Sequence, residues 1–320
     1  MIVRRMAQAL SPAGPGGRLS ILIFHRVLAA PDALLAGEPD IQRFHEVIGW
    51  VRRWFNVLPL DQAVAHLERA TLPQRAAAIT FDDGYADNAD HALPVLQHHG
   101  VCATFFVATD FLDGGRMWND TLIEALRQCP RHTLDLHALG LGRYALGSVA
   151  QRRQAIDTLL DRIKYLPPAQ RLHTVTLVAE LAGTRLPDTL MMRSDQVRTL
   201  RQAGMQIGAH TASHPILQTL PDAQAQGEIT RSKAALESLL QEPVTLFAYP
   251  NGKPGTDYSA RHVAMVRAAG FAAAVSTAPG AARAPCDLHQ LPRFTPWDQS
   301  RTRYGLRLLR NLRTATRPAA

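Results

Sequence analysis

Two short segments of the chain hold residue types that suit metal-assisted hydrolysis. Asp82 and Asp83 follow an apolar run at 76–80, and His210 and His214 follow another at 205–209. Two neutral imidazoles and one carboxylate are a frequent ligand set for a catalytic divalent ion, because three protein ligands leave positions open for water and substrate. The remaining carboxylate can then accept a proton from the bound water, whose pKa the ion lowers.

Each segment also has a simpler interpretation. Asp-Asp-Gly is a common turn, and two histidines four residues apart occur by chance in a chain with 13 histidines. The context favours a site, because an apolar run precedes the histidines and Pro215 follows them. A strand that ends in a loop or a first helical turn would place both imidazoles on one face.

The same two segments resemble motifs of the polysaccharide deacetylases with a NodB homology domain, carbohydrate esterase family 4. Residues 80–84 read T-F-D-D-G, like the first motif of that family, and residues 210–214 read H-T-A-S-H, like its second motif, H-S/T-x-x-H. The resemblance implies that Asp82 is the general base and that Asp83, His210 and His214 bind a divalent metal. Zinc is the first choice for this ligand set, and cobalt, nickel, iron or manganese would also suit it.

A third segment resembles the family less closely. Residues 247–252 read F-A-Y-P-N-G, similar to a motif written R-x-P-Y-G or F-A-Y-P-Y-G, and Ala248 stands where many members have an arginine that supports the catalytic aspartate. The resemblance implies that the backbone N–H of Asn251 helps to bind the oxyanion, a role that does not depend on the side chain. The alternative for this segment is a turn without a catalytic role.

The general acid is less clearly marked. Leu291-Pro292-Arg293 occupies the position of the family's L-x-H motif, so arginine replaces the usual histidine. Arg293 cannot supply a proton at neutral pH, but it can support Asp82 in place of the missing arginine. His25, at the end of the apolar run 21–24, is the preferred candidate acid, with a structural histidine as the alternative. His289 is the second candidate, but it precedes the last strand.

The order of apolar runs predicts an α/β fold. Seven strand-like runs alternate with helical patterns, which favours a parallel sheet; they cover residues 20–24, 76–80, 102–107, 205–209, 244–248, 271–275 and 290–294. Asp40 and Ser194 mark two helix starts, and Gly204 marks the end of the second helix. The resemblance implies a distorted (β/α)7 barrel, whose reactive residues gather at the carboxyl ends of the strands.

The long stretch between the two strong motifs predicts an insertion at about 114–192. Its pattern indicates helices at 119–129, 148–165 and 168–182 and no strand, and we expect it to form a helical cap over the substrate pocket. Trp118 at its start either stacks on a sugar ring or anchors the cap. We therefore divide the chain into a flexible segment (1–18), a barrel with the insertion (19–298) and a C-terminal helix and tail (299–320).

Composition bounds the cellular setting. The chain has 320 residues and three cysteines without regular spacing, typical of reduced thiols. The first 18 residues contain no apolar core like that of a signal peptide, and no run reaches the roughly 18 apolar residues of a membrane span. We therefore expect a cytoplasmic enzyme, and we infer that its substrate is a glycan precursor or lipid-linked sugar.

The excess of positive charge, +8 in total, is concentrated at the C-terminus. Arginines alternate with leucines between residues 301 and 313, so a helix there would be basic and amphipathic. Such a helix can lie on the inner face of an anionic membrane, here through residues 299–313, or it can pack its leucines on the barrel. We find no motif of a nucleic-acid reader and expect no nucleic-acid partner.

We therefore expect a metal-dependent hydrolase that removes N-acetyl groups from an amino sugar in a polysaccharide, an oligosaccharide or a lipid-linked precursor. The alternatives are an O-acetyl esterase, a non-carbohydrate amide hydrolase on the same site, or a sugar-binding homologue without activity. Retention of the base and all three ligands disfavours the last alternative. The sequence does not predict the oligomeric state.

Overall fold

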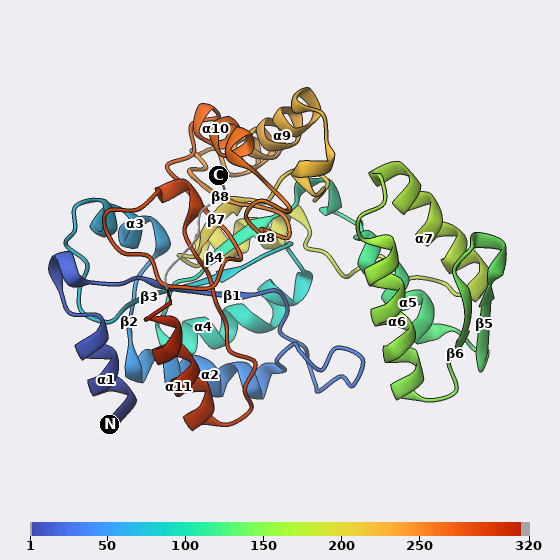
Figure 1. Ribbon diagram of the computed structural model, residues 1–320, viewed down its shortest axis with the longest axis horizontal. Coiled ribbons are helices and arrows are strands. Elements are labelled where there is room, and N and C mark those ends of the chain that lie inside the picture. Colours follow the sequence, from blue (N-terminus) through green and yellow to red (C-terminus); the bar gives the residue numbers. More distant parts are fainter. Residues whose placement is uncertain (1, 315–320) are drawn as a thin grey trace.

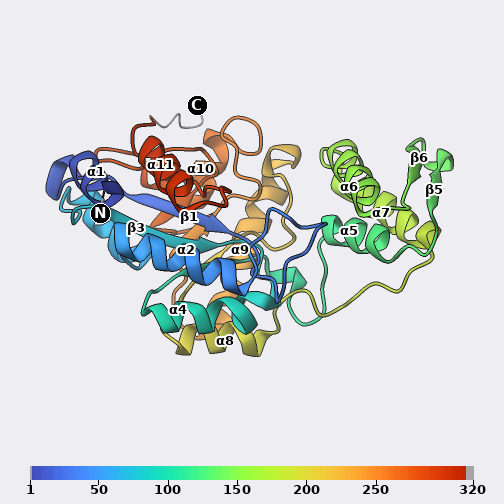
Figure 2. The same cartoon turned by 90° about the horizontal axis from the view of Figure 1, so that it is seen from below.

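The computed structural model describes residues 2–314, and its centre is a curved parallel sheet surrounded by helices (Figures 1 and 2). The strands are β1 (Ser20–Phe24), β2 (Asn56–Val57), β3 (Ala76–Phe81), β4 (Thr104–Val107), β7 (Gln206–Ala209), β8 (Leu246–Ala248) and β9 (Ala273–Val275). They run in the order β1-β3-β4-β7-β8-β9, with β2 beside β3. This is the α/β fold of a distorted (β/α)7 barrel that the sequence predicted.

The sheet closes through a segment that is not a regular strand. Leu291 forms a parallel bridge to Val275 in β9, and Arg293 forms one to Ile21 in β1. The predicted seventh strand at 290–294 is therefore present only as these isolated bridges, while the two-residue strand β2 was not predicted. The result is that the chain joins β9 to β1 at Arg293.

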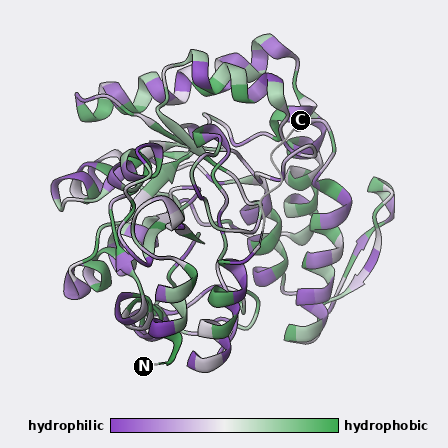
Figure 3. Ribbon diagram, turned by 60° about the vertical axis from the view of Figure 1, so that its left-hand side comes forward, coloured by the Kyte–Doolittle hydropathy of each residue, from purple (hydrophilic) through white to green (hydrophobic). Residues whose placement is uncertain are grey.

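Helices cover the outside of the sheet and form the rest of the molecule. They are α1 (Ile2–Leu10), α2 (Ile41–Trp54), α3 (Leu60–Glu68), α4 (Leu93–His99), α5 (Trp118–Gln128), α6 (Val149–Ile163), α7 (Pro168–Ala182), α8 (Ser194–Gln202), α9 (Asp222–Leu240), α10 (Ala260–Ala268) and α11 (Arg301–Asn311). Most carry hydrophobic and hydrophilic residues on different faces (Figure 3). In α2, Asp40 caps the N-terminus by accepting the Arg43 N–H, and Phe44, Val47, Ile48 and Val51 are buried.

Within the described residues, which begin at Ile2, the N-terminal segment is ordered, contrary to our expectation of flexibility for 1–18. Ile2, Val3, Met6, Ala7 and Leu10 recur at helical spacing. They form α1, which packs against α2 and α11 and buries Ala7 completely. The polar and proline-rich residues that follow concealed this short amphipathic pattern.

The insertion forms a separate lobe beside the barrel (Figures 1 and 2). The three predicted helices appear as α5, α6 and α7, and they share a core of their own around Leu126, Leu159 and Val178. The expectation of no strand there was wrong, because β5 (Thr133–Leu136) and β6 (Gly142–Ala145) pair as an antiparallel hairpin. Alternating burial within β5 is the period-2 signal that four residues were too few to reveal.

The C-terminal helix α11 packs its apolar face on the protein. Tyr304, Leu308, Leu309 and Leu312 are buried, whereas the arginines face water. Of the two alternatives for this helix, the structure shows the one in which its leucines pack on the barrel. Residues 315–320 of the expected tail lie outside the described residues. Within residues 2–314, no helix is both long and apolar enough to cross a membrane.

Candidate active site

The site residues follow the carboxyl ends of four parallel strands. His25 follows β1, Asp82 and Asp83 follow β3, His210 and His214 follow β7, and Asn251 follows β8. Parallel strands place these ends on one rim, so residues far apart in sequence meet there. These residues line one cavity of about 420 Å³, which we call the catalytic pocket: His25, Asp82, Asp83, His210, His214 and Asn251. The structure thus brings the predicted residues together, and Arg293 reaches them from behind Asp82.

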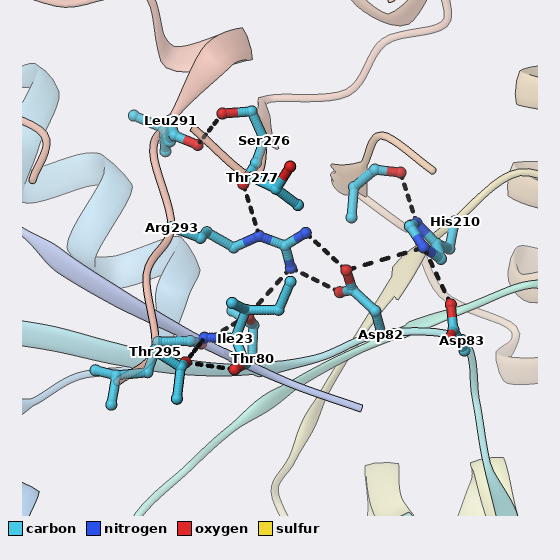
Figure 4. Close-up of polar contacts among 12 residues, drawn as sticks. Ile23, Thr80, Asp82, Asp83, His210, Ser276, Thr277, Leu291, Arg293 and Thr295 are labelled. Atoms are coloured by element: carbon cyan, nitrogen blue, oxygen red, sulfur yellow. Dashed lines mark hydrogen bonds and ion pairs between the residues drawn. The ribbon is translucent and has the colours of Figure 1, made fainter. Parts of the chain in front are cut away.

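Three of them form a candidate metal centre. One ligand atom each from Asp83, His210 and His214 lies within 4.8 Å of the others. The Nε2 atoms of His210 and His214 are 3.4 and 3.3 Å from Asp83 Oδ1. His210 Nδ1 lies 2.8 Å from the carbonyl oxygen of Ala248, so this nitrogen carries the proton and Nε2 has its lone pair free for a cation (Figure 4). The donor set and the tautomer therefore fit a divalent ion.

The backbone at these ligands adopts conformations that side chains rarely take. Asp83 has φ +77°, Thr211 +62° and His214 +53°. Gly84 follows with φ +89°, and a Cβ there would lie 3.1 Å from Val107 Cγ1, so only glycine suits the turn. Such strain persists where the surrounding structure holds it, and it is frequent at functional sites.

Burial and charge set the ionisation of the candidate ligands. Burial alone would raise the pKa of Asp83, but the neighbouring His214 and His210 imidazoles outweigh it and hold this pKa well below its usual range. Burial lowers the pKa of His214 to about 4. Asp83 is therefore an anion and His214 a neutral imidazole at neutral pH, which are the forms that bind a metal.

Asp82 has a different partner. Its two carboxylate oxygens accept hydrogen bonds from both terminal nitrogens of Arg293, at 2.6 and 2.7 Å (Figure 4). Arg293 is 1% exposed and also donates from Nε to the carbonyl oxygen of Ser276. Burial would raise the pKa of Asp82, but the Arg293 charge outweighs it and lowers the pKa. The sequence predicted that Arg293 can support Asp82 in place of the arginine that is missing at Ala248, and the structure shows this contact.

The two candidate acids occupy different places. His25 lines the catalytic pocket, and three carboxylates, Asp83, Glu38 and Asp82, raise its pKa although burial opposes them. A raised pKa favours the protonated imidazole, which is the form that a general acid needs. His289 instead places Nε2 2.9 Å from the carbonyl oxygen of Phe271 and does not line the pocket. It is a structural histidine.

Asn251 has the backbone geometry expected of an oxyanion donor. It has φ +58°, and its carbonyl accepts the Thr277 hydroxyl at 2.7 Å. Its N–H has no acceptor within residues 2–314. A backbone donor without a protein acceptor beside the catalytic pocket is available to a substrate oxygen.

Two supporting groups were missed by the sequence. Glu228 in α9 accepts hydrogen bonds from the N–H groups of Ala212 and Ser213 at 3.0 and 2.7 Å and thereby fixes the loop that carries the histidines. Asp120 in α5 is 3% exposed and lines the catalytic pocket; Tyr85 donates to its Oδ1 at 3.1 Å, and its Oδ2 has no partner in the described chain. Tyr85 directly follows the T-F-D-D-G motif, but nothing local in the sequence connects Glu228 or Asp120 to the site.

The insertion forms one wall of the catalytic pocket, as a cap would. Trp118 and Ile123 from α5, Leu160 from α6 and Lys164 directly after α6 line it. Trp118 also packs at the edge of the cap's core and under Arg171, so it anchors the cap, and stacking on a sugar ring stays a prediction. Burial raises the pKa of Asp120 to about 7, which makes the wall of the pocket responsive to pH near neutrality.

Comparison with known proteins gives the class. The family model described as polysaccharide deacetylase matches residues 69–274, so the chain belongs to the polysaccharide deacetylase family. Its enzyme class is a carbohydrate deacetylase, a hydrolase acting on carbon–nitrogen bonds.

Individual relatives are distant. The Bacillus subtilis protein YxkH is 22% identical over 278 residues, 86% of this chain and 70% of its own. A poly-beta-1,6-N-acetyl-D-glucosamine N-deacetylase of Staphylococcus epidermidis is 29% identical over 128 residues, 34% of this chain and 44% of its own. The fold is similar to that of the Streptococcus pyogenes deacetylase PplD in complex with acetate, with TM-score 0.60, 17% identity and coverage of 93% of this chain and 99% of that one. IcaB from Ammonifex degensii matches with TM-score 0.62, 18% identity and coverage of 93% and 98%.

Proposed function

We propose that the protein removes the N-acetyl group of an amino sugar with the help of a divalent metal, most simply zinc. The observation that carries this proposal is the arrangement of Asp82 beside the triad of Asp83, His210 and His214. It provides a base that is not a ligand next to three ligands that can hold a cation. An O-acetyl ester or a non-carbohydrate amide would suit the same groups, and a substrate panel separates these alternatives.

The chain's residues have separable roles. When bound, the metal supplies a water of lowered pKa and a positive charge for the carbonyl oxygen. Asp82 would accept a proton from the water that attacks the acetyl carbonyl, and the Asn251 N–H would donate to the carbonyl oxygen as negative charge grows there. His25 then gives a proton to the departing nitrogen, so that an amine and acetate leave.

The ion pair with Arg293 sets the pKa and the orientation of Asp82, the proposed base. A carboxylate has about four lone-pair positions, so two hydrogen bonds from Arg293 leave others for the attacking water. The lowered pKa makes Asp82 a weak base, but it also keeps the carboxylate ionised and fixed in orientation. A water of lowered pKa needs less driving force for proton transfer, so the two effects are compatible.

Acetate release tests this proposal. Purified protein is treated with a chelator, then resupplied with zinc, cobalt, nickel, iron or manganese, and assayed on N-acetylated monosaccharides, oligosaccharides and lipid-linked sugars. We expect release that is lost on chelation and restored by a metal. Release only from O-acetyl esters would assign the alternative activity, and unchanged release after chelation would reject the metal site.

The compartment of the protein and its contact with a membrane are proposals that do not depend on the active site. We propose cytoplasmic residence and contact of residues 299–313 with the inner membrane face, the latter supported by the exposed arginines of α11. Leu308 and Leu309 of α11 are buried and Leu306 is 52% exposed, so such contact would rely on the arginines and on this one leucine. Cell fractionation tests the first, and flotation with anionic liposomes, with and without residues 300–320, tests the second.

A further inference from the structure

A second cavity, of about 960 Å³, adjoins the catalytic pocket; we call it the side cavity. It lies between the loop 31–40 and the segment 293–299, and it shares His25, Glu38 and Thr277 with the wall of the catalytic pocket. Its volume is in the range of pockets that hold a drug-sized ligand. An acetamido group in the catalytic pocket would leave this space free, so another part of the substrate can occupy it.

The wall of the side cavity is mainly apolar. Phe24, Phe294 and Trp297 contribute aromatic surface, and prolines line it at positions 31, 39, 279 and 296. Trp297 is 70% exposed and stands next to Phe294, with ring centroids 6.1 Å apart. An exposed aromatic side chain that lines a cavity provides an apolar entrance from the solvent.

Most charged side chains of this wall already have partners; Glu38 accepts the Arg26 N–H at 3.2 Å and Asp40 the Arg43 N–H at 2.7 Å. Asp32 is 2.7 Å from Arg127, Arg43 is 3.0 Å from Glu46, and Asp298 pairs with Arg307. Arg293 is held by Asp82. Among the described residues of the wall, two buried side-chain oxygens have no hydrogen-bond partner, the Tyr304 hydroxyl and Asp298 Oδ2, and the second of them is held in the ion pair with Arg307. Sugar hydroxyls placed here would therefore lose water without gaining enough hydrogen bonds, which disfavours a polymer of sugars.

The catalytic pocket has the opposite character. Asp120 and Asn251 line it with the metal ligands, and Asp120 Oδ2 and the Asn251 N–H have no hydrogen-bond partner in the described chain. A sugar ring with its acetamido group finds donors and acceptors there. We propose that the side cavity binds a long alkyl or isoprenoid chain attached to the substrate's amino sugar, so that the enzyme acts on a lipid-linked sugar. This inference rests on the proposed deacetylase function.

Two probes that differ only in chain length test it: the methyl and octyl glycosides of N-acetylglucosamine, used below micelle-forming concentrations. We expect kcat/KM for the octyl glycoside to be at least about tenfold higher, through a lower KM, because burying two or three methylenes suffices for that gain. Trp297→Ala removes apolar wall and Ala36→Trp fills the cavity, so each should lower the octyl-to-methyl ratio. Leu172→Ala, on α7 and 60% exposed, removes apolar surface elsewhere and should leave the ratio unchanged.

Binding separates this inference from the proposed activity. Calorimetry on the metal-loaded Asp82→Asn variant should show the octyl glycoside binding at least about tenfold more tightly than the methyl glycoside. If no acetate is released from either probe but this difference is present and is lost in Trp297→Ala, the deacetylase proposal fails and the cavity assignment stands. Equal binding and equal kcat/KM, or a ratio unaffected by both cavity variants, would overturn the cavity assignment.

Discussion

Arg293 and Asp82 are 211 residues apart in sequence, yet they form a two-pronged ion pair in which both side chains are almost completely buried. The pair exists because the irregular segment around Arg293 closes the barrel beside β1, directly behind the carboxyl end of β3. The presence of arginine at the position where the family motif has histidine is thus explained by geometry. The Arg293 side chain holds the Asp82 carboxylate, and in the proposed mechanism it supports the base and is not an acid.

Arg293→Met should destabilise the protein by about 3–5 kcal/mol, because it leaves the Asp82 carboxylate buried without a counter-charge. Urea unfolding at neutral pH measures this change. Arg307→Met, which breaks an exposed pair with Asp298, serves as the control and should cost about 1 kcal/mol or less. In the double variant Asp82→Asn/Arg293→Met most of the loss should be recovered; additive losses would show that the pair is not coupled.

Glu228→Ala should weaken metal binding about 10- to 100-fold, since it releases the loop that orients His214. Competition with a chromogenic zinc chelator measures the affinity. Glu242→Ala removes a carboxylate of the same type from an exposed pair with Arg201 and should leave the affinity unchanged. Equal affinities for all three proteins would mean that the loop is held by other contacts.

Asp120→Asn should change how stability depends on pH. In the folded protein the pKa of Asp120 is about 7, above its ordinary value of 3.8, so folding favours the protonated form. The free energy of unfolding therefore falls as the pH rises from about 4 to about 7 and stays lower above that. The amide cannot ionise, so the metal-free variant should lack this fall and be more stable at pH 8 by up to about 4 kcal/mol. Parallel stability profiles from pH 4 to 8 would contradict the assignment.

His25→Gln should lower kcat about 10²- to 10⁴-fold if His25 donates the proton to the leaving nitrogen. The pKa of His25 is raised by Asp83, Glu38 and Asp82, so the wild-type rate should fall as the pH rises through that pKa and the acid is lost. The variant should lack this alkaline fall. The corresponding change His289→Gln, at a structural histidine, should retain the wild-type pH profile. If His289→Gln loses the alkaline fall and His25→Gln keeps it, His289 is the general acid and His25 the structural histidine.

The sequence predicted the site residues that stand in short motifs, and it did not predict those that tertiary packing brings to the site. The four residues Asp82, Asp83, His210 and His214 stand in short motifs after apolar runs, so their place on the rim followed from strand order alone. Asp120 could not be found in this way, because its approach to the site depends on how the inserted lobe packs over the barrel. The same holds for Glu228, whose contact with the histidine loop is made by the next helix along the chain.

The errors in the predicted fold have physical causes as well. α1 was missed because its helical spacing is followed by a stretch rich in proline and glycine, and the hairpin of β5 and β6 because its strands have only four residues each. Segment 290–294 reads Q-L-P-R-F, and Pro292 at its centre lacks an N–H and interrupts regular pairing. The bridges on either side of that proline are what place Arg293 behind Asp82.

Acetate release by zinc-loaded wild-type protein and by Asp82→Asn, with zinc content measured on the same samples, tests the central claim most directly. The account predicts that the variant folds, binds zinc as the wild type does, and releases acetate at least about 10²-fold more slowly, because it keeps all three ligands and lacks the base. A zinc-loaded variant with a near wild-type rate would contradict the assignment of Asp82 as the base.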